Sequence, residues 1–402
     1  MPEPCSAPEA CAAMIDPDEV AAWLRLEAVP GLGRRTARLL LDKFGLPQQV
    51  LAAGEAQLAR WLPGPVARDV RARPDAALSA RIGRTVAWLR EPGHHLLTLA
   101  DAAYPRPLLD LADPPLLLYA RGRLEILQRP ALAVVGARSA TVQGGRDAEL
   151  FASTFSSAGI TVVSGLALGI DAAAHAGGLA GPGGTIAVVG TGLDRCYPAC
   201  HRALGQRIAA EGLLLSEFPL GTPARSQHFP QRNRLIAALA RGVLVVEAAL
   251  RSGSLITARL AAELGREVFA VPGSIHAPLA AGCHRLIQQG AKLVASPQDV
   301  FEEPGLLAGP RASPWASPWA GSRADSWAGG SRAAGKPETA ARSSAAADAL
   351  GTALAYDPVD PDTLCIRTGL PPEAVAAALL QLELTGAVER MPGNLYRRLA
   401  QA

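Results

Sequence analysis

The sequence predicts an α/β fold built on a doubly wound parallel sheet, with a helical domain before it and a winged-helix domain after it. Short apolar runs recur through the central part of the chain, and they are β-branched or leucine-rich without alternation, as expected for strands covered on both faces. Helical stretches separate several of these runs, which is typical of a parallel sheet with crossover helices. The predicted strands are 132–135, 160–163, 185–189, 213–215, 243–246 and 268–271.

The N-terminal part divides into two segments. Residues 1–16 are rich in Pro, Ala and Glu and are predicted to be disordered. Residues 17–90 have a helical pattern and contain the glycine hairpin 29–35, Val-Pro-Gly-Leu-Gly-Arg-Arg, which is typical of a SAM-like or helix-hairpin-helix-like domain. The hairpin can present amides to a phosphate or simply form a turn between helices, and we favour the turn.

The central α/β domain is expected to span 91–302, and composition changes abruptly after it. Residues 303–345 are dominated by Ala, Ser, Gly, Pro and Arg and are predicted to form a flexible linker. Residues 346–402 show two helices followed by a hairpin, the pattern of a winged helix. The second helix carries Glu373 and Glu383 and no Lys or Arg, so we favour a protein-contact role over reading of a duplex.

Composition restricts the location and the partners of the protein. Six scattered cysteines form no disulfide framework, which fits a reducing compartment. Neither a secretion signal nor an uncharged apolar run of membrane-spanning length is visible, so we expect a cytoplasmic protein without a membrane partner. Cys196, Cys200 and His201 have no second ligand pair at zinc-site spacing, and we therefore expect no metal or other cofactor.

Positive charge is concentrated in one segment. The net charge is only +3, so a surface for nucleic acid must be a local patch. Residues 225–259 contain six arginines and a single acid, Glu247, and they end in a Gly-Ser turn at the start of a predicted helix. Cations beside a helix N-terminus predict a polyanionic ligand.

Glycine-rich or hydroxyl-rich loops follow four of the predicted strands. These loops are 136–139, 164–171, 190–192 and 247–254. In an open α/β sheet the ligand lies beyond the carboxyl ends of the strands, where glycines allow the backbone to approach it closely. The loops contain no Gly-x-Gly-x-x-Gly after the first strand and no P-loop, which disfavours a dinucleotide enzyme and a P-loop ATPase.

Several side chains near these loops admit two interpretations. Asp171 and His175 form a general-base pair, or Asp171 caps a helix and orients His175, which we favour. Glu247 is a catalytic carboxylate or the partner of an arginine from 225–241, and the sequence does not decide between them. Phe229 is a base-stacking ring or a core ring, whereas Tyr197 is expected in the core.

The central loops closely resemble those of the DNA-processing protein A family, also called DprA or Smf. The resemblance extends in order over about 100–300. It is carried by the segments AVVGARSAT (133–141), VVSGLALGIDAAAH (162–175), TIAVVGTGLDRCYP (185–198), SEFPLGTP (216–223), HFPQRNRLIA (228–237), VLVVEAALRSGSLITA (243–258) and VFAVPG (268–273).

The resemblance implies an extended Rossmann-like domain that binds single-stranded DNA without turnover. It also implies a homodimer that protects incoming strands during natural transformation and recombination and helps to load the RecA recombinase. The phosphate-binding residues that it implies, together with neighbouring polar and cationic residues of the same loops, are Gly136, Arg138, Ser139, Ser164, Gly165, Arg202, Arg232, Asn233, Arg234, Ser252, Gly253, Ser254 and Thr257. Phe229 is the candidate for base stacking.

An enzymatic alternative remains at this stage. Rossmann-like folds with glycine-rich loops also hydrolyse small nucleotides, so a nucleotide phosphohydrolase or glycosidase is the second hypothesis. Asp171 or Glu247 would then be the general base.

Overall fold

A nine-stranded sheet organises the centre of the chain. The computed structural model describes residues 16–303 and 359–398, the latter without 369, 385–386 and 392–394. All of the predicted disordered segment except Asp16, which caps the first helix, and all but the first residue of the predicted linker lie outside the described residues. In spatial order the strands are β1 (His94–Thr98), β2 (Leu117–Gly122), β6 (Leu213–Ser216), β5 (Thr185–Val188), β4 (Thr161–Ser164), β3 (Ala131–Val135), β7 (Gly242–Val245), β8 (Glu267–Ala270) and β9 (Lys292–Leu293).

All six predicted strands are present and run parallel to one another. The register of β3 aligns Val134 with Leu244 of β7 on one side, and Ala133 with Val163 of β4 on the other. Because the chain leaves β3 toward β4 and later returns to β7, the order of strands reverses between β3 and β7. Such a switch point opens a crevice outside the carboxyl ends of its two strands.

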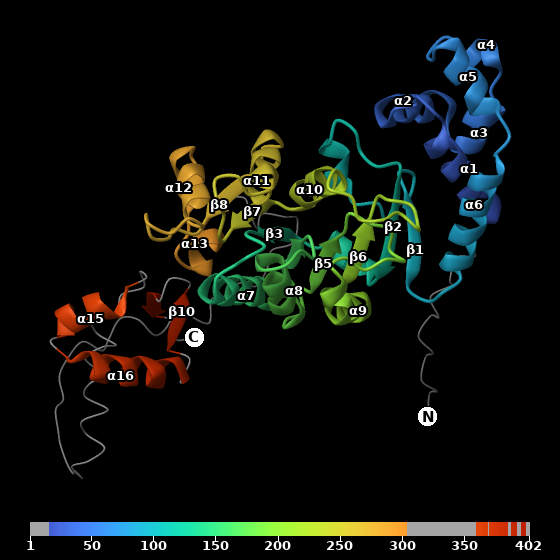
Figure 1. Ribbon diagram of the computed structural model, residues 1–402. Coiled ribbons are helices and arrows are strands. Elements are labelled where there is room, and N and C mark those ends of the chain that lie inside the picture. Colours follow the sequence, from blue (N-terminus) through green and yellow to red (C-terminus); the bar gives the residue numbers. More distant parts are fainter. Residues whose placement is uncertain (1–15, 304–358, 369, 385–386, 392–394, 399–402) are drawn as a thin grey trace, which may run out of the picture.

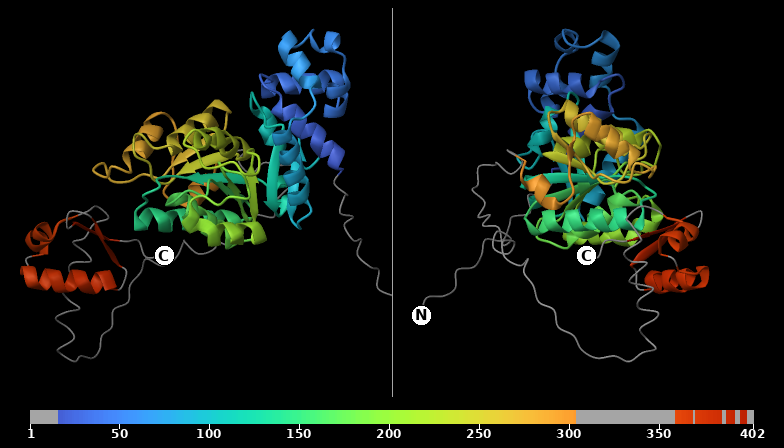
Figure 2. Two further views of the ribbon diagram at one scale, coloured as in Figure 1. Left: turned by 45° about the vertical axis from the view of Figure 1, so that its right-hand side comes forward. Right: turned by 90° about the vertical axis from the view of Figure 1, so that its left-hand side faces the viewer.

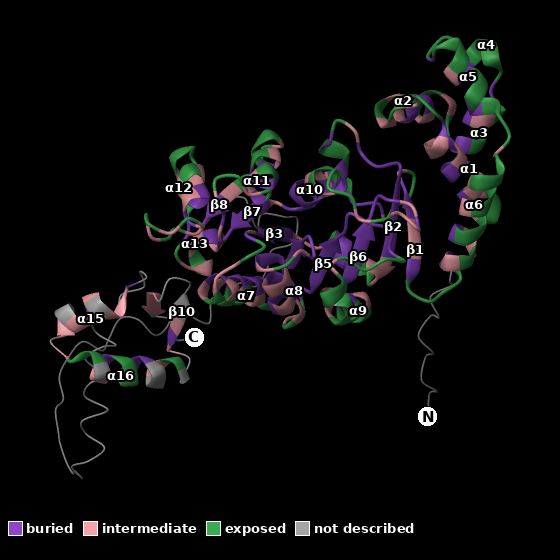
Figure 3. Cartoon of the chain, in the orientation of Figure 1, coloured by how far each residue is buried: buried purple, intermediate pink, exposed green. Residues whose placement is uncertain are grey.

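The sheet is buried on both faces, as the continuous apolar runs predict (Figure 3). Leu132 and Val134 of β3 face a cluster with Phe151 and Phe155, whereas Ala133 faces the opposite cluster. The first face is covered by α7 (Val142–Ser157), α8 (Ile170–Leu179) and α13 (Pro297–Phe301). The second is covered mainly by α10 (His228–Leu239), α11 (Ser254–Glu263) and α12 (Ala281–Gln288), while α9 (Arg202–Glu211) packs against β6. Short 3-10 turns are η1 (Arg106–Asp110), η2 (Leu124–Gln128) and η3 (Ala199–His201).

The N-terminal helices pack against the β1–β2 end of the sheet (Figure 1). They are α1 (Pro17–Ala28), α2 (Arg34–Phe44), α3 (Pro47–Ala52), α4 (Glu55–Leu58), α5 (Gly64–Arg71) and α6 (Ala76–Leu89). Trp23 and Leu24 of α1 join Tyr119 of β2 in one apolar cluster. The antiparallel strands β1 and β2 are an addition that the sequence-based prediction of a parallel sheet lacked.

The C-terminal elements lie at the opposite end of the molecule, beside α7 (Figure 2). They are α15 (Pro361–Thr368), α16 (Pro372–Leu384) and the hairpin β10 (Val388–Met391) and β11 (Leu395–Arg398), which is the predicted order of a winged helix. Glu389 accepts a hydrogen bond of 3.3 Å from the backbone N–H of Val142, so this module contacts the N-terminus of α7. No helix in the described ranges is both long and apolar enough to span a bilayer.

Candidate nucleic-acid interface

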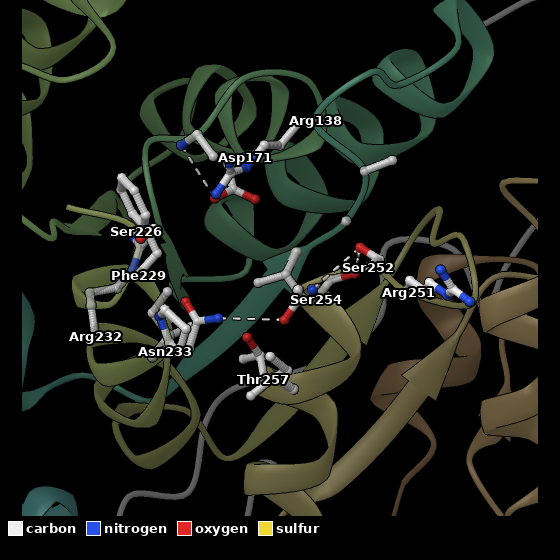
Figure 4. Close-up of a pocket in the computed structure, with 18 of the residues that line it drawn as sticks. Arg138, Asp171, Ser226, Phe229, Arg232, Asn233, Arg251, Ser252, Ser254 and Thr257 are labelled. Carbon is white, nitrogen blue, oxygen red and sulfur yellow. Dashed lines mark hydrogen bonds between the residues drawn. The ribbon is translucent and has the colours of Figure 1, made fainter. Parts of the chain in front are cut away.

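A cleft of about 750 Å³ lies outside the carboxyl ends of β3 and β7, at the switch point of the sheet. The loop after β3 forms one wall, α10 forms a second, and the turn that opens α11 forms the third (Figure 4). Ten of the fourteen predicted site residues line it: Gly136, Arg138, Ser139, Phe229, Arg232, Asn233, Ser252, Gly253, Ser254 and Thr257.

The loop after β3 needs glycine at its first position. A Cβ on Gly136 would lie 2.6 Å from Ile170 Cγ1 and 2.9 Å from the carbonyl oxygen of Glu247, so a larger residue would displace the loop. This close packing fixes the backbone that leads to Arg138, whose side chain is exposed. The guanidinium carbon of Arg138 lies 5.2 Å from the centroid of the Phe229 ring, and this cation–π contact holds the charge at the cleft.

Two rings form an aromatic wall beside Arg138. The Phe229 and Tyr197 centroids are 5.5 Å apart, with an interplanar angle of 35°. The expectation that Tyr197 is a core ring is wrong, because the residue is 49% exposed and lines the cleft. The wall therefore offers aromatic surface next to a cation.

Arg232 forms part of the cleft floor and is only 4% exposed. Its guanidinium donates to the Val188 carbonyl oxygen, and its Nε has no hydrogen-bond partner among the described residues. Burial lowers the pKa of Arg232 to about 10, and the neighbouring Asp171 carboxylate opposes that shift, so the side chain stays cationic at neutral pH. A buried cation with an unused N–H group beneath a cleft is suited to an anionic ligand.

Hydroxyl and amide groups gather where α11 begins. The Ser252 and Ser254 hydroxyl oxygens are 2.7 Å apart and hydrogen-bonded. The Asn233 side chain donates to the Gly253 carbonyl oxygen at 3.4 Å, which links α10 to this turn. The first N–H groups of a helix lack partners within the helix, so the turn presents donors and a positive dipole end to the cleft.

Four predicted site residues do not line the cleft, and the structure gives three of them other partners. The buried Ser164 hydroxyl donates to the Val134 carbonyl oxygen at 2.7 Å, and the Gly165 N–H donates to Asp171 at 3.1 Å. Arg234 pairs with the buried carboxylate of Glu217. Arg202 is the first residue of α9 and lies outside the cleft lining.

The loop 164–171 is an internally bonded turn. Asp171 accepts hydrogen bonds from Gly165 and Ala167, so its carboxylate organises the backbone that precedes α8. Burial raises the pKa of Asp171, while Arg232 and these N–H groups lower it. His175 is oriented by hydrogen bonds with Leu166 and Thr185 and not by Asp171. The N-cap of α8 is Gly169, without a side-chain cap, so the prediction that Asp171 caps the helix and orients His175 is wrong on both points.

Glu247 holds the start of α7. It accepts hydrogen bonds from the Thr141 backbone N–H at 3.0 Å and from the Thr141 hydroxyl at 2.6 Å. Thr141 in turn caps α7 by accepting from Gly144. The predicted pairing of Glu247 with an arginine from 225–241 is therefore wrong.

Sequence reasoning missed part of the lining. Arg225, Ser226, Arg251 and Ile256 border the cleft, in addition to Tyr197. The two arginines belong to the cation-rich segment 225–259, which was the available signal. Ser226, in the loop before α10, and Ile256 of α11 carried no signal in the sequence, because their positions depend on how these helices pack.

The fold and the cleft define a class: a Rossmann-like α/β protein with an arginine-lined crevice at the switch point of its sheet and a C-terminal winged helix. A sequence profile described as DNA recombination-mediator protein A matches residues 95–305, and one described as the DprA winged helix domain matches 334–394. The chain belongs to the DNA recombination-mediator protein A family, also named DprA or Smf.

Relatives match over most of their length. Protein Smf of Escherichia coli is 42% identical over 80% of this chain and 82% of its own. Protein Smf of a Synechocystis species is 38% identical over 94% of this chain and 99% of its own. The X-ray structure of DNA processing protein A from Streptococcus pneumoniae aligns with a TM-score of 0.61 and 39% identity, covering 72% of this chain and 98% of that one.

Proposed function

We propose that this protein binds single-stranded DNA by holding its sugar-phosphate backbone in the cleft. The main observation behind this proposal is that Arg138, Arg232 and the Ser252–Ser254 turn line the same cleft at the switch point of the sheet. Guanidinium groups, hydroxyls and helix N-terminal amides are the donors that phosphates use in proteins. Because phosphates are identical along a strand, binding should depend little on base sequence.

The aromatic wall supports an unpaired strand over a duplex. The face of a base is accessible to a ring only when that base is unstacked, and stacking on an aromatic side chain contributes about 1–3 kcal/mol per base. Phe229 and Tyr197 lie beside Arg138, so a base can stack while its phosphate meets the guanidinium. Every base has such a face, which again predicts weak sequence preference.

We base the proposed cellular role on the family. The profile that matches residues 95–305 describes a recombination mediator, and the relatives from Streptococcus pneumoniae and Bacillus subtilis are named DNA processing protein DprA. We propose that this protein acts in the cytoplasm, protects incoming strands in natural transformation and delivers them to the RecA recombinase. We also propose a homodimer that uses the 275–290 region, where Ile275 is 82% exposed.

Binding without turnover is the form of this function that the side chains favour. A hydrolase would need a free carboxylate at the cleft to activate water. The Asp171 and Glu247 carboxylates each accept two hydrogen bonds that shape the loops around them. Because both carboxylates serve to order the backbone of these loops, a structural role accounts for them without a hydrolytic one.

The test is a fluorescence titration of single- and double-stranded oligonucleotides with the full chain and with Arg138→Ala. We expect tighter binding of the single strand. We expect the variant to lose about tenfold in affinity for all sequences alike, because one charge-assisted contact is worth about 1.5 kcal/mol. Arg207→Ala, on exposed α9 and away from the cleft, is the matched control and should bind normally.

Two binding results would contradict the proposal, and one activity result would favour its alternative. Equal affinity for duplex and single strand would show that the aromatic wall does not stack unpaired bases. A loss in Arg138→Ala confined to particular sequences would mean that the side chain reads bases rather than phosphates. Release of free base from nucleoside monophosphates would revive the hydrolase hypothesis.

A further inference from the structure

Two exposed cysteines lie on either side of Tyr197, which belongs to the aromatic wall. Cys196 directly precedes this ring in the chain, and Cys200 follows it in η3. Tyr197 lines the cleft, whereas neither cysteine does, so the pair has no role in the binding site described above. Cys283, by contrast, is buried in the core. The two exposed thiols are therefore accessible to reagents and lie next to a residue of the site.

The two thiols belong to one tight turn. The Cys196 thiol donates to the Pro198 carbonyl oxygen at 3.6 Å, and the same oxygen accepts from the His201 N–H at 3.1 Å, which closes the turn that contains Cys200. Burial raises the pKa of Cys196, Arg202 opposes that shift, and the charge of Cys200 adds to it. Because such an effect requires a short separation, a modest adjustment of the turn brings the sulfurs to bonding distance.

The chain is anchored on both sides of this turn. Before it, the Arg195 N–H donates to the Gly192 carbonyl oxygen at 3.0 Å. After it, Nδ1 of His201 donates to the Leu166 carbonyl oxygen at 3.1 Å. A bond between the two sulfurs must therefore be accommodated by the segment between these anchors. That segment carries Tyr197, so its ring moves relative to the cleft.

We propose that Cys196 and Cys200 are a redox modification site, at which oxidation by a peroxide forms a reversible disulfide that displaces Tyr197 and weakens the binding of single-stranded DNA. The disulfide itself is independent of the proposed function, whereas its effect on DNA rests on that function. In a reducing compartment such a bond is transient, as in redox-sensing proteins.

The oxidation takes place in two steps. Cys200 reacts first, because burial disfavours the Cys196 thiolate. Its sulfur attacks one oxygen of hydrogen peroxide, the O–O bond breaks, and water leaves a sulfenic acid on Cys200. The Cys196 sulfur then attacks the Cys200 sulfur, the S–O bond breaks, and the hydroxide leaves as a second water with the proton of the Cys196 thiol. Two thiols and one peroxide thus give one disulfide and two waters, and an added dithiol reverses the bond.

The first measurement locates the disulfide. Trypsin cleaves after Arg195 and Arg202, so both thiols fall on one peptide, 196–202. The full chain is treated with hydrogen peroxide, its free thiols are alkylated, and the digest is weighed by mass spectrometry. We expect this peptide to be free of alkyl groups and lighter by two hydrogen atoms, and to be alkylated twice after dithiothreitol. Two alkylated thiols after peroxide, added oxygen without a disulfide, or a bond to another cysteine overturns the inference.

The second measurement compares the affinity for an oligothymidylate of about 20 nucleotides before and after oxidation. We expect a loss of about fivefold or more that dithiothreitol reverses, because fivefold is about 1 kcal/mol, the low end for one stacked base. The salt slope should not change, since no cation is lost. Cys200→Ser is the matched control, and it should bind like the reduced protein with or without peroxide. Tyr197→Ala should bind more weakly from the start and lose nothing further on oxidation.

The outcomes separate the inference from the proposed function. A disulfide that leaves the affinity unchanged overturns the inference, and so does an equal loss of affinity in Cys200→Ser. A further loss on oxidation of Tyr197→Ala also overturns it, because the effect would then not pass through that ring. Failure of the reduced, unaltered protein to bind the probe overturns the proposed function instead, and the peptide mass still decides whether the disulfide forms.

Discussion

His175 shows how one buried side chain fixes the loop beneath the cleft. Its Nε2 accepts a hydrogen bond of 3.1 Å from the Leu166 N–H, so the proton must be on Nδ1, which donates to the Thr185 hydroxyl at 2.7 Å. Burial, and after it the positive charge of Arg232, lower the pKa of His175 to about 3. The ring is therefore neutral throughout the physiological range.

This histidine predicts an acid-dependent loss of stability. Between pH 6.5 and about 3 the unfolded chain binds a proton at this site that the folded chain does not, so the free energy of unfolding must decrease as the pH falls. The expected contribution is about 1.4 kcal/mol between pH 7.5 and 5.5. Denaturant unfolding of the unaltered protein and of His175→Gln at both pH values measures it.

The difference between the two proteins isolates the site from other titrating groups. His175→Gln should be less stable at pH 7.5, because it disturbs a buried network, but its stability should change less with pH. An identical pH dependence for both proteins would contradict the prediction, because it would show that the ring takes up a proton as readily in the folded chain as in the unfolded one.

At the scale of elements, α7 and α8 approach each other closely because α8 has glycine, without a side chain, at the point of contact. A Cβ on Gly177 of α8 would lie 2.9 Å from the Ala152 Cβ and 2.9 Å from the Ser153 nitrogen. A Cβ on Gly145 of α7, by contrast, would have no atom within 4 Å. Gly177→Ala should therefore destabilise the protein by about 1–3 kcal/mol through overpacking.

Gly145→Ala is the matched control on the partner helix. It should be neutral or stabilising by up to about 1 kcal/mol, because alanine restricts the unfolded chain and clashes with nothing. Thermal unfolding of both variants gives the comparison. Equal destabilisation would mean that the cost reflects helix propensity and not the close approach of the helices.

The parallel strands could be predicted from the sequence because a strand that is buried on both faces appears as a continuous apolar run. Residues of β3 such as Leu132 and Ala133 are apolar on alternating faces, so the run is continuous. The antiparallel strand β2 was missed although its first four residues are buried. Its cover comes from Trp23 and Leu24, about a hundred positions earlier in the chain, and no local pattern reveals such a contact.

The candidate site could be predicted where strand ends fix the position of a residue, and not where a helix fixes its direction. Gly136 and Ser252 follow strands that meet at one edge, and both line the cleft. Arg232 and Arg234 are two positions apart on α10, which places their side chains about 200° apart around the helix. One lines the cleft and the other pairs with Glu217, so both could not serve a single ligand.

At the scale of the whole molecule, Arg234 has a different task. Glu217 lies between Arg234 of the α/β core and Arg34 of the N-terminal helices, with a carboxylate that is 1% exposed. Burial raises the pKa of Glu217. The two arginines oppose that shift, Arg234 more strongly than Arg34. The buried carboxylate has one cationic partner in the α/β core and one in the N-terminal helices. It therefore stabilises the contact between these two parts of the protein, because the loss of either arginine would leave buried charge uncompensated. Arg34 is thereby engaged in the domain contact, which agrees with the interpretation of the glycine hairpin as a turn.

The final prediction concerns the salt dependence of DNA binding and starts from the net charge of the chain. A net charge of +3 gives little long-range attraction, so affinity for DNA must come from local contacts at the cleft. If about five phosphates are neutralised there, the logarithm of the association constant should fall with the logarithm of salt concentration with a slope near −3.5. Titrations of an oligothymidylate between 0.05 and about 0.5 M salt measure the slope. Affinity extrapolated to 1 M salt then reports stacking on the aromatic wall, which Phe229→Leu should reduce without changing the slope. A slope near zero is incompatible with phosphate binding, because counterions are released whenever cations replace them on the strand.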